Sequence, residues 1–235
     1  MTRQELKEQV EHDQFTDAIT GAVDYARAHR EQLIRWAGIA IAVLVVAGLV
    51  FWYLSYKNSE RQQDLQNAFQ VLEAPVGPAN PATPWAKSFL TQDAKTKASI
   101  KAFSDVVAKD GGSRQGLIAQ YYRGTLEAQN GSNSAAESDL NAVANTSSEC
   151  APLAKIALAQ VYAGENKIAQ ARGLLQEIVN KPTDLVSKAQ AQILLARLDE
   201  TTNPQQAQKL LNSLRTPNQD PAVTRALDQN SSHMR

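Results

Sequence analysis

The side chains that most often carry out enzyme chemistry are few and scattered in this sequence. Its three histidines, His12, His29 and His233, lie far apart, and its single cysteine, Cys150, cannot by itself form an internal disulfide or a thiolate metal site. The sequence has no HExxH, no GxSxG, no phosphate-binding loop and no glycine fingerprint after a strand. It therefore predicts a protein that is not an enzyme and that holds no metal and no cofactor.

Two adjacent carboxylates, Asp199 and Glu200, are the remaining candidates for acid–base catalysis. A catalytic pair needs surroundings that shift its pKa values, whereas neighbouring acidic residues are more often found at a solvated helix end. We therefore interpret this pair as a solvent-exposed helix end.

The charged residues give no reason to expect a polyanionic partner. Lysine plus arginine and aspartate plus glutamate each total 24, and the two signs are nearly balanced on both sides of Lys57. A surface that binds nucleic acid needs an excess of positive charge. The sequence thus predicts no nucleic-acid partner, and without a phosphate loop or a cofactor motif it predicts no small-molecule substrate.

One segment is long and apolar enough to cross a membrane. Residues 36–56 form a run of 21 without a charged side chain, bounded by Arg35 and Lys57. At about 1.5 Å of rise per residue, a helix of this length covers the roughly 30 Å of bilayer hydrocarbon. Its ends carry aromatic residues of the kind that favour the headgroup region: Trp36, Trp52, Tyr53 and Tyr56. Helices buried in soluble cores are usually shorter, so we predict one transmembrane helix that stays as an anchor.

The basic residues beside this helix predict its orientation. Arg27, Arg30 and Arg35 lie on its N-terminal side, against Lys57 and Arg61 on its C-terminal side. Because positive charge is retained on the cytoplasmic side of a membrane, we expect a cytoplasmic N-terminus. In a bacterium this orientation describes a single-pass inner-membrane protein whose larger C-terminal domain is periplasmic.

Residues 1–35 form a short arm with a helical pattern. Thr2 followed by Glu5 is typical of a helix N-terminus, where both side chains cap free backbone amides. Apolar residues then recur at helical spacing: Leu6, Val10, Phe15, Ile19 and Val23. The pattern predicts an amphipathic cytoplasmic helix, which either docks a partner or packs on lipid headgroups or on itself.

The rest of the chain has a helical pattern interrupted by turn residues. Residues 57–92 continue the helix and then carry four prolines around Gly77, which indicates a juxtamembrane helix and a Pro-rich linker. Residues 93–215 are rich in alanine and leucine and nowhere alternate as a strand would, and residues 216–235 form a C-terminal tail. Turns are indicated at Gly111-Gly112, Asn130-Gly131, Ser147-Ser148, Gly164, Lys181-Pro182 and Asn203-Pro204.

Small and aliphatic residues return in the same order within residues 93–215. Three sets, separated by 35 and then 36 positions, carry this period: Ala136, Leu140 and Val143; Ala171, Leu175 and Ile178; Ala207, Leu211 and Leu214. Upstream of each set lies one small residue: Gly124, Ala159 and Ala196. A shift of 34 back from the first set reaches Ala102 and Val106 but meets Lys109 in the third position, as in a degenerate copy. Such a period predicts stacked helical hairpins.

The middle copy resembles the tetratricopeptide repeat family. The residues that carry the resemblance are Leu158, Ala159, Tyr162, Ala171, Leu175, Ile178 and Pro182. The preceding copy departs from the family pattern at Arg123 and Glu127, where a leucine and a tyrosine are expected. With the membrane segment, the resemblance implies an all-α fold: a single N-terminal transmembrane helix followed by a tetratricopeptide-like α-solenoid of about three to four helical hairpins.

The resemblance also implies a concave face on which proteins of this family bind peptides. Three helices are expected to contribute side chains to it: Ile118, Tyr121, Tyr122 and Thr125; Ile156, Gln160 and Ala163; Ile193 and Arg197. This groove is mostly apolar and lacks the lysine and asparagine set with which some relatives bind a terminal carboxylate. Tyrosine and arginine commonly anchor interfaces. Alternatively, Tyr121 and Tyr122 only pack between hairpins, one ring buried and the other half-exposed.

The order of the parts is similar to that of the ancillary SecYEG translocon subunit family of bacterial inner membranes, which also has a polar arm, one membrane helix and an external repeat domain. This resemblance implies a membrane-anchored scaffold or chaperone-like adaptor. Its partners would be polypeptides on the extracytoplasmic side, such as exported chains or the translocon itself. The alternative is a transmembrane regulator whose cytoplasmic arm binds a soluble partner.

Overall fold

The fold is helical, as the sequence predicts. The computed structural model describes residues 30–78, 87–200 and 202–214, and these residues contain eight helices and no strand. Some of the predictions concern residues outside this described part: those for most of the arm, the three histidines, the C-terminal tail and the regulator hypothesis. The chain divides into two compact units, one up to Ser59 and one from Glu60 onward.

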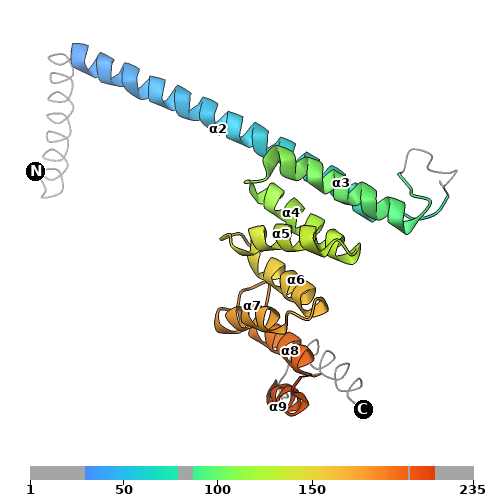
Figure 1. The fold of residues 1–235 in the computed structure, drawn as a ribbon. Helices are drawn as coiled ribbons and strands as arrows, with labels where there is room; N and C mark the ends of the chain where they lie inside the picture. The colour runs from blue at the N-terminus through green and yellow to red at the C-terminus, as the bar shows by residue number, and fades with distance from the viewer. Residues whose placement is uncertain (1–29, 79–86, 201, 215–235) are drawn as a thin grey trace, which may run out of the picture. The chain divides into compact units, whose positions relative to one another are not determined.

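Helix α2 spans Arg30–Glu73 and contains the whole uncharged run (Figure 1). Every described side chain from Trp36 to Tyr56 is exposed, among them many valines and leucines. By length and composition, this part of α2 is able to cross a membrane. An apolar surface of this extent is unfavourable in water, so its exposure is consistent with a lipid environment.

Prolines end α2 and begin its connection to α3. Pro75 follows the last residue of the helix by two positions, and its ring cannot continue the helical hydrogen-bond pattern. Val76 and Phe89 then form an isolated parallel bridge, in which the Gly77 amide donates to the Phe89 carbonyl at 2.8 Å. The bridge joins the two ends of the Pro-rich connection, whose middle, residues 79–86, lies outside the described residues.

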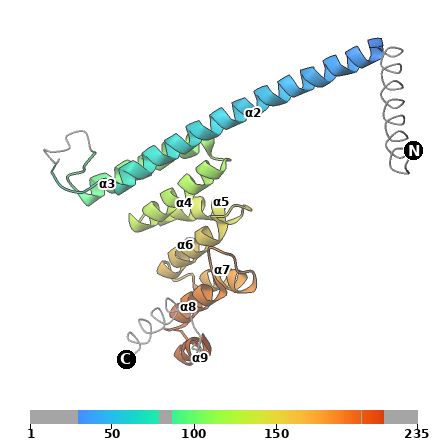
Figure 2. The same cartoon turned by 180° about the vertical axis from the view of Figure 1, so that it is seen from behind.

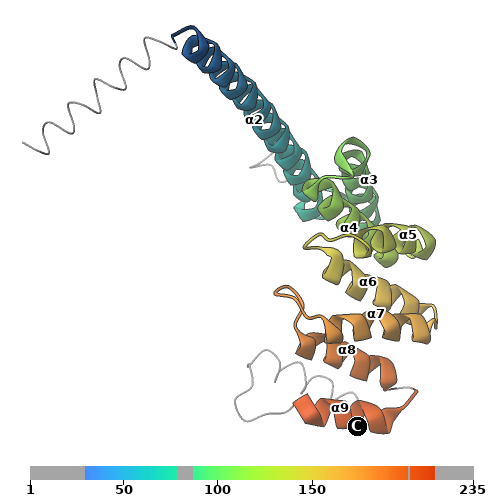
Figure 3. The same cartoon turned by 90° about the vertical axis from the view of Figure 1, so that its left-hand side faces the viewer.

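The remaining helices follow one another in chain order. They are α3 (Gln92–Asp110), α4 (Arg114–Gln129), α5 (Asn133–Ala144), α6 (Ala151–Gly164), α7 (Ile168–Asn180), α8 (Lys188–Asp199) and α9 (Pro204–Leu214). Hydroxyl side chains cap the N-termini of three of them: Thr91, Ser113 and Ser187. Each helix packs against the next, and α4 also contacts α6. Figures 2 and 3 show this stack of successive helices from two further directions.

The residues that carry the sequence period form the core of the hairpins α4–α5, α6–α7 and α8–α9. The alanine column at Ala136, Ala171 and Ala207 is 0% exposed at every position. The leucines that follow are at most 6% exposed, and Gly124, Ala159 and Ala196 are buried on α4, α6 and α8. The predicted fold class, with stacked helical hairpins, is therefore confirmed.

The register of the earliest copy differs from the shift of 34 suggested by the sequence. Helix α3 buries Ser99, Phe103 and Val106. Lys109 is exposed and Ala102 only half-buried, so the copy is displaced by 37 positions from Ala136 (136 − 99 = 37). Ser99 is 0% exposed and occupies the place of the alanine. A serine is nearly as small as an alanine and fits the same position, but because it is polar, a search for apolar residues at a fixed spacing does not detect it.

The C-terminal part of α2 packs against α3. Ala68 is buried, and the ring centroid of Phe69 lies 5.4 Å from that of Phe103 in an edge-to-face arrangement. The Lys109 ammonium donates to Asp64 at 2.7 Å and to Glu60 at 2.8 Å. These contacts extend the helical stack to residues before position 93, where the sequence analysis begins the repeat domain.

Helices α4 and α5 approach each other most closely at Gly124. A Cβ atom added there would lie 2.9 Å from Cγ of Leu140 and 3.2 Å from Cβ of Asp139, inside normal contact distance. The leucine is fully buried and has little room to move. Gly173, which lies on the exposed side of α7, has no such neighbour within 4 Å.

We expect Gly124→Val to destabilise the repeat domain by about 1–3 kcal/mol, because the added carbons overpack the α4–α5 crossing. Thermal or urea unfolding followed by circular dichroism measures the change. Gly173→Val is the matched control, and its stability should be unchanged or slightly higher because valine is a better helix former than glycine. Equal stability of the two variants would contradict the close approach at Gly124.

Candidate functional site

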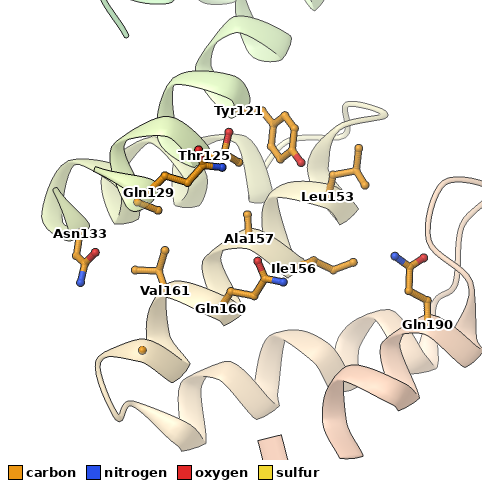
Figure 4. A pocket seen from close by; sticks show the side chains of 12 residues that line it. Tyr121, Thr125, Gln129, Asn133, Leu153, Ile156, Ala157, Gln160, Val161 and Gln190 are labelled. Carbon is orange, nitrogen blue, oxygen red and sulfur yellow. The ribbon is translucent and has the colours of Figure 1, made fainter. Parts of the chain in front are cut away.

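The larger of two adjoining pockets lies between α4 and α6. This main pocket has a volume of about 690 Å³. Its lining residues come mostly from those two helices, with one each from α5 and α8: Tyr121, Thr125, Ala128, Gln129, Asn133, Leu153, Ile156, Ala157, Gln160, Val161, Gly164 and Gln190. Figure 4 shows their side chains arranged around a common space, with Gln160 near its middle. Such a volume is within the usual range of ligand sites, about 300–1,000 Å³.

A second pocket of about 300 Å³ is lined by residues of α6, α7 and α8. It shares Ile156 and Gln160 with the main pocket, so the two form adjoining parts of one surface. Its other lining residues are Ala159, Ala163, Ile168, Leu175, Leu194, Arg197 and Leu198. Among the described residues that line the two pockets, only Arg197 carries a charge at neutral pH.

Six of the nine residues predicted for the groove line these pockets. Four of them surround the main pocket: Tyr121, Thr125, Ile156 and Gln160. Ala163 and Arg197 line the second pocket, together with the two shared residues. The three helices predicted to form the groove therefore contribute to one continuous surface.

The other three predicted residues lie elsewhere. The Tyr122 ring stacks on Phe103 at 5.6 Å and meets Phe69 edge-to-face at 4.8 Å. Ile193 is 6% exposed and packs in the core between α8 and α9, and Ile118 is half-buried and lines neither pocket. Because adjacent residues on a helix point about 100° apart, Tyr122 faces α2 and α3 while Tyr121 faces the main pocket.

Tyr121 forms the aromatic wall of the main pocket. Its ring meets that of Tyr122 edge-to-face at 5.2 Å, which holds it against the preceding helices. Burial of the phenol raises its pKa, and the neighbouring Tyr122 and Cys150 raise it further. Tyr121 is therefore a neutral hydrogen-bond donor at physiological pH.

Eight of the twelve residues that line the main pocket were not anticipated from the sequence. Ala128, Gln129 and Val161 extend the faces of α4 and α6 toward their C-termini, whereas Asn133 and Gln190 stand near the first turns of α5 and α8. Residues at helix ends do not follow the repeat period, so their position depends on the turns. The one available signal was the recurrence of glutamine and asparagine near predicted turns.

Two ion pairs with buried carboxylates and partly exposed arginines were also missed. The Asp139 carboxylate on α5 receives two hydrogen bonds from Arg123 on α4, and the Asp199 carboxylate on α8 pairs with Arg172 on α7. The interpretation of Asp199 as a solvated helix end is wrong, because its side chain is 3% exposed. Arg123, which replaces the leucine of the family pattern, was the available signal, since a charge in a packed position requires a partner.

Glu127 lies beside the Arg123–Asp139 pair. It stands where the family pattern has a tyrosine, one helical turn after Arg123. Burial raises the pKa of its carboxyl group, and the negative charge of Asp139 raises it further. Three ionisable side chains thus replace apolar contacts at the α4–α5 crossing.

The Arg172–Asp199 pair provides a test of how the hairpins are joined. We expect Arg172→Met to lower the free energy of unfolding by about 1–3 kcal/mol, because it leaves the buried Asp199 carboxylate without its counter-charge, although solvent partly screens the exposed arginine. Arg114→Met is the matched control: it breaks the Arg114–Glu149 pair, whose side chains are 70% and 69% exposed, and should cost less than about 1 kcal/mol. Equal losses in urea unfolding would contradict the buried pair.

The comparisons with known proteins identify the repeat. A family model described as a tetratricopeptide repeat-like domain matches residues 32–181, which is more than half of the 235 residues. Searches of curated proteins and of solved structures found no match. Helices α8 and α9 lie beyond the matched residues but continue the same buried columns. The chain belongs to the tetratricopeptide repeat-like domain family.

Proposed function

We propose that this protein is a membrane-anchored scaffold or chaperone-like adaptor that binds polypeptides in the two pockets of α4, α6 and α8. The observation that carries the proposal is the continuous surface on which the main pocket, of about 690 Å³, and the second pocket share Ile156 and Gln160. Helical repeat domains of this kind typically bind proteins through such extended surfaces.

The proposal assigns binding rather than catalysis to these pockets. Their described lining residues are apolar or carry amide, hydroxyl and guanidinium groups. None of these groups is a strong nucleophile or a general base at neutral pH, whereas all of them can contact or hydrogen-bond a peptide. The acidic residues Asp139 and Asp199 lie outside the pockets and pair with arginines.

The membrane anchor of the proposal is the N-terminal part of α2. Its exposed apolar side chains between Trp36 and Tyr56 support insertion into lipid. The arginines before this segment support a cytoplasmic N-terminus and, in a bacterium, a periplasmic repeat domain anchored in the inner membrane. Tethering raises the effective concentration of the pockets near membrane partners.

The proposed ligands are exported polypeptides, and the proposed place of action is the protein translocon. The similarity in the order of parts to ancillary SecYEG subunits supports this more specific assignment. The uncharged main pocket also suits unfolded chains, which expose apolar segments before they fold.

Site-specific photo-crosslinking in intact cells tests the proposed binding site. A photoreactive amino acid in place of Gln160, which is exposed and lines both pockets, should form adducts with exported chains or translocon components. The matched control is the same substitution at Gln170, an exposed glutamine of α7. Adducts of equal yield at both positions, or none at Gln160, would contradict the proposal.

Removal of the apolar segment tests the anchor. The full chain should stay in the membrane pellet after alkaline carbonate extraction, whereas a variant without residues 36–56 should be released into the soluble fraction. Protease added outside spheroplasts should digest the repeat domain of the full chain. Release of the full chain by carbonate, or protection of its repeat domain, would contradict the anchor or its orientation respectively.

A further inference from the structure

The main pocket has a chemical character that the proposed function does not yet explain. None of its described lining residues is charged at neutral pH, although charged residues make up 20% of the sequence. A ligand side chain that brought a charge into this space would lose part of its hydration without gaining a counter-charge from the lining residues. The lining therefore disfavours acidic and basic ligand segments alike.

Four side-chain amides surround the same pocket: Gln129, Asn133, Gln160 and Gln190. Figure 4 shows Gln129 and Asn133 toward one end, Gln160 near the middle and Gln190 at the opposite end. Each amide both donates and accepts hydrogen bonds. A polypeptide backbone in extended form offers the same two functions at every residue, so amides spread along a pocket can pair with it whatever its sequence.

Apolar side chains fill the space between these amides. Leu153, Ile156, Ala157 and Val161 of α6 face the pocket, and the ring of Tyr121 lies across from them (Figure 4). They can contact the aliphatic side chains of a bound segment and remove apolar surface from water. A lipid acyl chain would also suit these residues, but it offers no hydrogen-bond partner to the four amides, so they would add nothing to its binding.

We propose that the main pocket binds an uncharged, extended segment of polypeptide, held by backbone hydrogen bonds to the side-chain amides and by aliphatic contacts to α6. The inference rests on the proposed function, because it assumes that the pocket binds polypeptides, and it adds the class of segment that is bound.

Peptide binding by the full chain in lipid nanodiscs tests this selectivity. Three fluorescein-labelled peptides share the same leucines and valines and differ only in their polar positions, which are serine and glutamine, lysine, or glutamate. The uncharged peptide should bind at least about tenfold more tightly than either charged one in fluorescence anisotropy, a difference of about 1.4 kcal/mol.

Gln160→Glu should shift the preference toward the lysine peptide and Gln160→Lys toward the glutamate peptide. Gln170→Glu and Gln170→Lys are the matched controls and should leave the preference unchanged.

The outcomes separate this inference from the proposed function. If all three peptides bind with equal affinity and the Gln160 variants alter binding, the proposed polypeptide binding stands, but the preference for an uncharged segment is overturned. Peptide binding that neither Gln160 variant alters would overturn both, because the pocket would not be the binding site. Displacement of the uncharged peptide by vesicles of uncharged lipid alone would assign the pocket to acyl chains and also overturn the inference.

Discussion

The close approach of helices at small side chains sets the geometry of this protein. On the first helices of three hairpins, Ala119, Ala154 and Ala191 are each 0% exposed, and on the second helices Ala136, Ala171 and Ala207 are equally buried. The distance between packed helices depends on the side chains at their contact, so alanine and glycine at these positions let neighbouring helices approach closely. With two faces of each first helix used in this packing, its third face lines the pockets. The position of the pockets is thus a consequence of where the small residues lie.

Two crossings in the stack use ion pairs in place of purely apolar contacts. Arg123–Asp139 lies within a hairpin, and Arg172–Asp199 joins one hairpin to the next. A buried ion pair contributes little net stability, because desolvation of both charges offsets their attraction, but it strongly disfavours any register that separates the partners. In a stack of similar hairpins, where alanines and leucines repeat, a slipped register would keep many apolar contacts. The two pairs therefore favour the observed register over such alternatives.

The repeating core could be predicted from the sequence because its buried alanines and leucines recur at a nearly constant spacing. The sequence pattern placed the earliest copy in the wrong register, since the buried Ser99 looks polar and Lys109 occupies the position expected from a shift of 34. For the main pocket, helical periodicity and the family resemblance placed two of the four lining residues of α4 and two of the six lining residues of α6. They placed Tyr122 in the groove, whereas its ring packs against Phe69 in the C-terminal part of α2. The repeat pattern does not include α2 and therefore could not predict this contact. The buried Asp199 was missed because its partner, Arg172, lies 27 positions away in another helix.

The uncharged pocket and the proposed anchor have complementary physical consequences. A pocket that contacts a peptide through amides and aliphatic groups has no ion pairs with which to discriminate strongly between sequences, so its affinity for any one segment is expected to be modest. Modest affinity is a disadvantage for a freely diffusing protein, but a chain held at the membrane meets ligands emerging there at a raised effective concentration. It also permits rapid release, since differences in affinity reside mostly in dissociation rates. Binding that is brief and tolerant of sequence suits the proposed role of a scaffold that contacts many different polypeptides in succession.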